Sequence, residues 1–99
     1  MKKLHTEEVD TLFEAILSLE SVEECYKFFE DVCTIKELQA MAQRFRVAAQ
    51  LSENKNYNEI QADTGASSAT ISRVNKCLLY GSGGYTTALQ RLSEEDSNG

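Results

Sequence analysis

A run of small hydroxyl and methyl side chains, followed by two basic ones, has the chemistry needed to contact a nucleic acid duplex. These residues are Ser68, Ala69, Thr70, Ser72, Arg73 and Lys76. Hydroxyls can bond to any base edge, methyl groups can meet the methyl of thymine, and basic groups neutralise phosphates. Small side chains also let one end of a helix approach the bases in a major groove. The same residues would equally suit the solvated face of an ordinary helical hairpin.

Two short helices joined by a tight turn would present this run, which predicts a helix-turn-helix at about residues 57–79. Asn56 and Glu59 have the spacing of a capping box for the first helix. Gly65 suits the left-handed position that ends it, because a residue without Cβ adopts positive φ at little cost. Ser67 or Ser68 would cap the second helix.

A small apolar core is expected to fix the angle between the two helices. Its members recur at helical spacing and are Ile60, Ala66, Ile71 and Val74. Gln61 stands four residues before the glycine, where this motif usually has alanine, so its long side chain must lean outward.

Apolar periodicity and capping residues predict helices in the rest of the chain as well, so the fold class is all-α. The expected helices are 6–19, 21–33, 34–52, 58–64, 68–80 and 85–92. Ser21 with Glu24, and Thr34 with Glu37, have capping-box spacing. The apolar stripes of these helices are interpreted as core, and the pattern does not say whether one subunit or two close that core. The domain would span 1–92, followed by an acidic disordered tail at 93–99.

The segment from Thr34 to Val47, TIKELQAMAQRFRV, and the run ATISR at residues 69–73 resemble the Trp repressor superfamily. Within it, the chain is similar to the small Trp repressor-related proteins of the YerC/YecD type, from about residue 5 to residue 92. The resemblance implies a six-helix subunit, an intertwined homodimer, and sequence-specific operator binding that represses transcription.

The resemblance also implies a ligand pocket, because Thr34, Arg44 and Arg73 match the threonine and two arginines that line the corepressor pocket of Trp repressor. Guanidinium groups stack on aromatic rings and pair with carboxylates, so an amino acid is a suitable ligand class. Alternatively, both arginines contact phosphates or solvent, and Thr34 is only a helix cap. Val74 and Cys77 replace a glycine and a serine of Trp repressor, which argues against tryptophan itself.

Charge is distributed unevenly along the chain. The net charge of −6 should repel a polyphosphate, but residues 1–31 hold three lysines against nine carboxylates, whereas residues 44–80 hold five basic and three acidic groups. Salt screens exposed charges over about 8 Å, so a local basic face can act despite an acidic far side. Arg46 and Lys55 are therefore expected to lie near phosphates, together with Arg73 and Lys76.

Composition excludes several other classes of protein. The chain has 41% hydrophobic and 26% charged residues and no apolar run long enough for a membrane span or a signal peptide. Three cysteines without metal-ligand spacing indicate reduced, buried thiols in a cytoplasmic protein. A lone histidine, His5, favours neither a metal site nor an enzyme.

The sequence therefore predicts a dimeric regulator of transcription that binds double-stranded DNA and needs no cofactor, with a small-molecule effector left open. The competing interpretation is a protein-interaction module in which the hairpin docks on another protein and the acidic first third carries the recognition.

Overall fold

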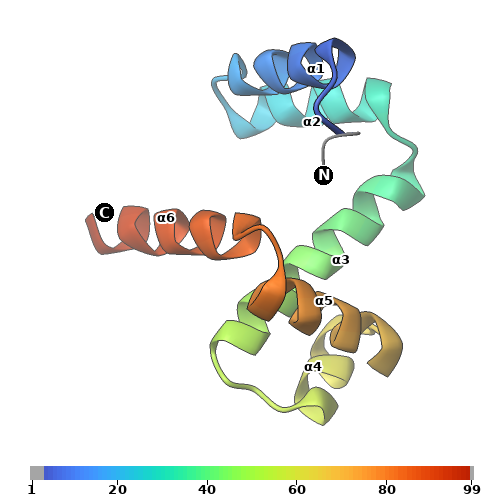
Figure 1. The fold of residues 1–99 in the computed structure, drawn as a ribbon, viewed down its shortest axis with the longest axis vertical. Helices are drawn as coiled ribbons and strands as arrows, with labels where there is room; N and C mark the ends of the chain where they lie inside the picture. The colour runs from blue at the N-terminus through green and yellow to red at the C-terminus, as the bar shows by residue number, and fades with distance from the viewer. Residues whose placement is uncertain (1–3, 99) are drawn as a thin grey trace. The chain divides into compact units, whose positions relative to one another are not determined.

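The computed structural model describes residues 4–98, and these residues form six α-helices with no strand among them. The helices are α1 (Glu7–Leu17), α2 (Val22–Val32), α3 (Ile35–Ser52), α4 (Tyr57–Thr64), α5 (Ser68–Tyr80) and α6 (Gly84–Asn98), as Figure 1 shows. The predicted all-α class and the number of helices are confirmed. The chain divides into two compact units, one through Leu38 and the other from Gln39. The polar start at residues 1–3 and the last residue of the acidic tail, Gly99, lie outside the described residues.

Local capping explains where the helices of the second unit begin. The Asn56 side chain accepts from the Glu59 N–H at 2.9 Å, and the Glu59 carboxylate accepts from the Asn56 N–H at 3.1 Å. This predicted capping box satisfies two N–H groups that have no partner within α4. Ser67 caps α5 by accepting from the Thr70 N–H at 3.2 Å, which decides between the two predicted serines.

Capping in the first unit follows the prediction at one helix and departs from it at another. Thr34 and Glu37 exchange both bonds of a capping box at the start of α3, at 2.8 and 3.1 Å. At α2, Ser21 accepts from the Glu24 N–H, but the Glu24 carboxylate accepts from the Glu20 N–H rather than from Ser21. The carboxylate thus reaches one residue further back than a capping box requires.

Residues 4–38, the described part of the first unit, contain no buried core of their own. Neither α1 nor α2 has a buried residue, and the apolar stripe predicted as core is largely exposed. Leu17 is 83% exposed, and Phe13, Val22 and Tyr26 are each more than half exposed. The apolar stripes of α1 and α2 are therefore not buried within the first unit.

The second unit is organised around a small buried cluster. Its members come from α3, α4, the turn and α5, and are Val47, Ala48, Ile60, Ala66, Ile71 and Val74. Leu51, Tyr85 and Leu89 pack against this cluster while remaining partly exposed. All four predicted members of the hairpin core are therefore buried, and α3 contributes the remaining two.

Two expectations need correction. Helix α6 continues to Asn98 instead of ending at Leu92, so residues 93–98 are helical where a disordered tail was expected. The three cysteines are free, but Cys77 is exposed and Cys25 and Cys33 are half-buried, so the expectation of buried thiols is wrong.

Candidate nucleic-acid interface

Helices α4 and α5 pack against each other through a turn centred on Gly65. Gly65 has φ +74°, the left-handed conformation that a C-terminal glycine supplies, and its N–H donates to the Gln61 carbonyl at 2.9 Å. Ala66 follows and is buried, while Ile60 on one side of the turn and Ile71 on the other are fully buried. The geometry is that of a helix-turn-helix, in which the core side of α5 is anchored and its other side is presented.

The presented side of α5 is formed by the small residues singled out from the sequence. Ser68, Ala69 and Ser72 are exposed, and Thr70 is half-buried. The Ser67 hydroxyl donates to Thr70 Oγ1 at 3.1 Å, so the threonine hydroxyl is already engaged with the cap. Since none of these four side chains belongs to the core, the N-terminal turns of α5 can approach another surface without unfolding the hairpin.

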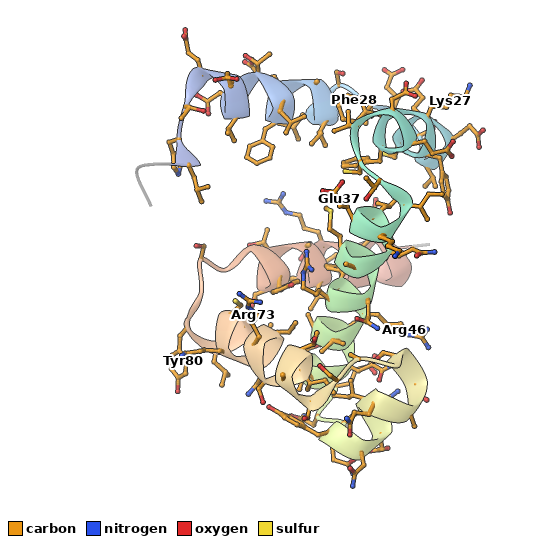
Figure 2. All side chains as sticks on the ribbon, turned by 90° about the vertical axis from the view of Figure 1, so that its right-hand side faces the viewer. Lys27, Phe28, Glu37, Arg46, Arg73 and Tyr80 are labelled. Carbon is orange, nitrogen blue, oxygen red and sulfur yellow. The ribbon has the colours of Figure 1, made fainter. Side chains whose placement is uncertain are left out.

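The four predicted basic residues differ in how exposed they are to solvent. Arg73 and Lys76 are exposed on α5, and Arg46 is exposed on α3. Figure 2 shows Arg46 projecting from α3 and Arg73 from α5. Lys55 is half-buried in the link before α4, where its Nζ lies 3.7 Å from Glu53 and 3.8 Å from Asp63. Three of the four side chains predicted to contact phosphates are therefore exposed to solvent, and the fourth, Lys55, is paired with carboxylates.

The three residues expected to line a ligand pocket are divided between the two units. Thr34 belongs to the first unit, where its hydroxyl caps α3 by accepting from the Glu37 N–H. Arg44 and Arg73 belong to the second unit, and both are exposed. The capping role of Thr34 is the alternative interpretation of that residue, and it is the role that its contacts show.

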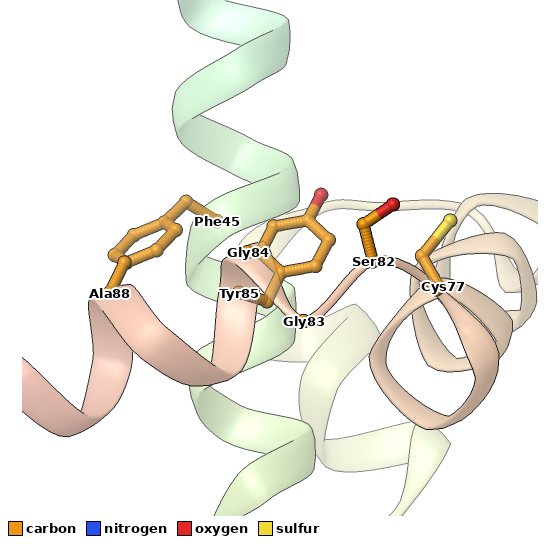
Figure 3. Close-up of a pocket in the computed structure, with 8 residues that line it drawn as sticks. Phe45, Cys77, Ser82, Gly83, Gly84, Tyr85 and Ala88 are labelled. Carbon is orange, nitrogen blue, oxygen red and sulfur yellow. The ribbon is translucent and has the colours of Figure 1, made fainter. Parts of the chain in front are cut away.

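A shallow hollow of about 540 Å³ lies between the end of α5, the glycine-rich link formed by residues 81–83, and the start of α6 (Figure 3). The rings of Phe45 and Tyr85 line it with centroids 6.2 Å apart, and Cys77 and Ala88 contribute to its wall. None of its lining residues is charged, so an amino acid bound there would have no partner for its ammonium or carboxylate group. The hollow contains none of the three predicted ligand residues.

Sequence reasoning missed three side chains that shape this region. Gln43 of α3 donates from Nε2 to the Thr64 carbonyl at 3.1 Å, and Glu53 and Asp63 pair with Lys55. Gln43 and Thr64 are 21 positions apart, so no local pattern could have paired them. Glu53 and Asp63 belong to the charge balance of residues 44–80, but their proximity to Lys55 depends on how the link folds.

Among residues 4–98, no helix is both long enough and apolar enough to span a bilayer. Among the described side chains, those of residues 4–95, no cluster of three or more histidine, cysteine, aspartate or glutamate residues could hold a metal ion.

The fold and the presented α5 define a helix-turn-helix protein. Residues 7–93 match the family model for the Trp repressor protein. The chain is also 53% identical over 95 residues to a Bacillus subtilis (strain 168) protein described as uncharacterized protein YerC, covering 96% of this chain and 91% of the relative. The chain belongs to the Trp repressor family.

Solved structures agree with this assignment. A TrpR-like protein from Eubacterium eligens ATCC 27750 superimposes with a TM-score of 0.92 at 53% identity, over 94% of this chain and 96% of that one. A Staphylococcus aureus protein described as a "putative Trp repressor" gives 0.90 at 46% identity, over 93% and 92% of the two chains. The family consists of DNA-binding regulators and not of enzymes, as expected for this chain.

Proposed function

We propose that the protein is a dimeric, sequence-specific DNA-binding repressor of transcription that acts in the cytoplasm, with residues 1–92 working as one Trp repressor-like domain. The observation that carries the proposal is the exposed front of α5, where Ser68, Ala69 and Ser72 are held outward by the buried Ile71 and Val74. A major groove admits a helix that is anchored to its protein on one side and carries small side chains on the other.

In this proposal the residues of the interface have two kinds of role. Ser68, Ala69, Thr70 and Ser72 meet base edges, which distinguish one sequence from another. Arg46, Lys55, Arg73 and Lys76 lie near phosphates, which supply affinity for any sequence and make it dependent on salt.

The dimer is supported by the first unit, in which α1 and α2 have no buried residues. A chain of 99 residues buries a modest part of its surface alone, and the exposed apolar side chains of α1 and α2 would stabilise a shared core. Two α5 helices related by a twofold axis would then read half-sites about one helical turn apart. Sedimentation equilibrium at micromolar concentration should give twice the monomer mass, and a monomer at all concentrations would contradict this part.

Selection from random duplexes at low salt tests DNA recognition directly. We expect enrichment of a motif with two related halves. A variant with Ala69→Glu, which places a long carboxylate at the front of α5, should retain the fold because Ala69 is exposed, yet enrich nothing. If the unaltered protein enriches no motif, the proposal of a sequence-specific repressor fails.

Modulation by a small ligand is a finer part of the proposal. Arg44 and Arg73 are both exposed guanidinium groups, and a carboxylate-bearing molecule such as an amino acid is the ligand class they fit. A thermal-shift screen against amino acids should find at least one that raises the melting temperature of the dimer, because a ligand that binds the folded state stabilises it by mass action. No shift with any amino acid would argue against an effector of this class.

The acidic, apolar-faced first unit also suits a protein-interaction module, which is the second candidate function. Residues 1–31 carry nine carboxylates, and α1 and α2 expose apolar side chains. A pull-down from nuclease-treated lysate separates the two candidates, since a tight protein partner that survives nuclease, together with no enriched DNA motif, would favour this function.

A further inference from the structure

A single side-chain hydrogen bond ties the turn of the helix-turn-helix to α3. Gln43 donates from Nε2 to the carbonyl oxygen of Thr64 at 3.1 Å, and both residues are half-buried. Among residues 4–95, whose side chains are described, it is the one side-chain hydrogen bond that joins residues more than four positions apart. Ala66 of the turn also shares the buried apolar cluster with Val47 and Ala48 of α3, and apolar packing sets no direction of its own.

Thr64 is held from several sides at this point. Its hydroxyl donates to the Ile60 carbonyl at 2.7 Å and accepts from the Ala66 N–H at 3.1 Å. Its own carbonyl is one of the last in α4, where a carbonyl has no partner within the helix, and Gln43 supplies that partner. The last peptide of α4 is therefore fixed both to its own turn and to α3.

The direction in which α5 points depends on this peptide. Only Gly65, Ala66 and Ser67 separate Thr64 from the start of α5. A rotation of the Thr64 peptide is therefore passed to the recognition helix over very few bonds. Helix α3, which holds the Thr64 peptide through Gln43, also carries Arg46. The hydrogen bond of Gln43 therefore helps to fix the orientation of the candidate base contacts on α5 relative to this candidate phosphate contact on α3.

We propose that Gln43 is a positioning residue that sets the angle of the helix-turn-helix on α3, and thereby the half-site spacing that the dimer accepts. The inference rests on the proposed function, because half-site spacing has meaning only for a dimer that binds DNA. A residue that only completed the end of α4 would affect stability and leave the preferred spacing unchanged.

Binding to duplexes of altered spacing tests this role. Starting from the selected motif, one base pair is added or removed between the half-sites, which turns one half-site by about 35° relative to the other. The unaltered protein should lose about tenfold or more in affinity for each altered duplex. Gln43→Leu keeps a side chain of similar size but has no hydrogen-bond donor. Its affinity for each altered duplex should fall by about threefold or less, because the angle of the helix-turn-helix on α3 is no longer fixed.

Two further variants serve as controls. Gln43→Lys restores a donor of sufficient reach and should regain most of the spacing discrimination. Gln90→Leu, on the exposed side of α6, removes a glutamine whose side chain makes no hydrogen bond among the described residues and should bind like the unaltered protein. If Gln43→Leu is folded and discriminates spacing as strongly as the unaltered protein, the proposal is overturned.

Amide hydrogen exchange on the protein without DNA tests whether the hydrogen bond from Gln43 to Thr64 holds the turn, and this test does not depend on the proposed function. The Gly65 and Ala66 amides should exchange about fivefold faster or more in Gln43→Leu, while the Ile71 amide in the anchored part of α5 keeps its rate. If the Gly65 and Ala66 amides exchange at the same rates in Gln43→Leu as in the unaltered protein, the Gln43 hydrogen bond does not hold the turn. Should selection enrich no motif at all, the proposed function fails, and these rates still decide whether Gln43 holds the turn.

Discussion

The ammonium nitrogen of Lys55, in the link before α4, lies 3.8 Å from Oδ2 of Asp63 near the end of that helix. A second carboxylate, that of Glu53, lies 3.7 Å from the same nitrogen. Both pairs are partly exposed, so each contributes little to stability, but together they keep a candidate phosphate contact occupied. DNA binding would compete with these carboxylates for Lys55, and their negative charge would itself oppose a phosphate.

Replacing Asp63, the one of these two carboxylates that lies in a helix, should therefore strengthen binding to DNA. We expect Asp63→Asn to raise the affinity for any duplex by about two- to fivefold at low salt, with a smaller gain as salt is added. Fluorescence anisotropy over a range of salt concentrations measures this. Asp10→Asn removes the same charge from α1 and is the matched control, so an equal gain in both variants would show that net charge alone is responsible.

Two residues of α5 should separate specificity from general affinity. Thr70→Val removes a hydroxyl at the proposed base contact and should change the motif that selection enriches. Lys76→Gln should weaken binding to all duplexes alike and reduce the slope of log affinity against log salt by about one unit. A Lys76→Gln variant with an unchanged slope would place this side chain away from the phosphates.

Gly65→Ala should destabilise the protein without any steric clash. A Cβ at Gly65 would meet nothing within 4 Å, but its φ of +74° is unfavourable for a residue with a side chain. The expected loss in the free energy of unfolding is about 1 kcal/mol. Gly84→Ala is the control, since Gly84 also has open space around its Cβ position but begins α6 without positive φ. Urea denaturation of both variants distinguishes conformational strain from crowding.

The start of α3 should lose stability in acid. Hydrogen bonds from the backbone and then the side chain of Thr34 lower the pKa of Glu37 below its ordinary value of 4.5. A carboxyl group whose pKa is lower in the folded state stabilises the fold above its unfolded pKa, and that stabilisation disappears as the pH falls through the folded pKa. The stability difference between the unaltered protein and Glu37→Gln should therefore be largest near neutral pH and shrink below about pH 4.5. Denaturation at a series of pH values checks this, and a difference independent of pH would contradict it.

Gln50→Leu should be neutral or stabilising. The Gln50 side chain is 7% exposed, and its Oε1 is buried without a hydrogen-bond partner. Because an unpaired buried acceptor costs about 1–3 kcal/mol, an apolar side chain of similar size should remove that cost. Gln50→Glu, which places a carboxylate at the same point, should destabilise by more than the leucine variant gains. Thermal melting of the three proteins ranks them.

Local features were the most predictable part of this fold. The boxes at Thr34 and Asn56 follow from residues three positions apart, and the turn follows from the residue type that adopts the φ of Gly65 most readily. The extension of α6 departs from the prediction because the acidic composition of residues 93–99 indicates disorder, whereas no stop signal ends the helix at Leu92. No glycine or proline interrupts the chain between Leu92 and Asn98, so nothing in the sequence ends the helix there.

Burial was less predictable than helix position. Apolar spacing identified the stripe of α1 correctly as a stripe, but Leu17 and Phe13 are exposed in the single chain because no element of the first unit covers them. The candidate nucleic-acid interface also has one part that the sequence pattern predicts and one part that depends on how the chain folds. The exposed front of α5 follows from helical periodicity, whereas the pairing of Lys55 with Asp63 depends on the path of the link between two helices.

The separation of anchoring and presented residues along α5 has an evolutionary consequence. Ile71 and Val74 are fixed by the hairpin core, while Ser68, Ala69 and Ser72 contribute nothing to it. Substitutions at these three surface positions carry little folding penalty, so a duplicated copy of this gene could drift toward a new target while inheriting an intact scaffold.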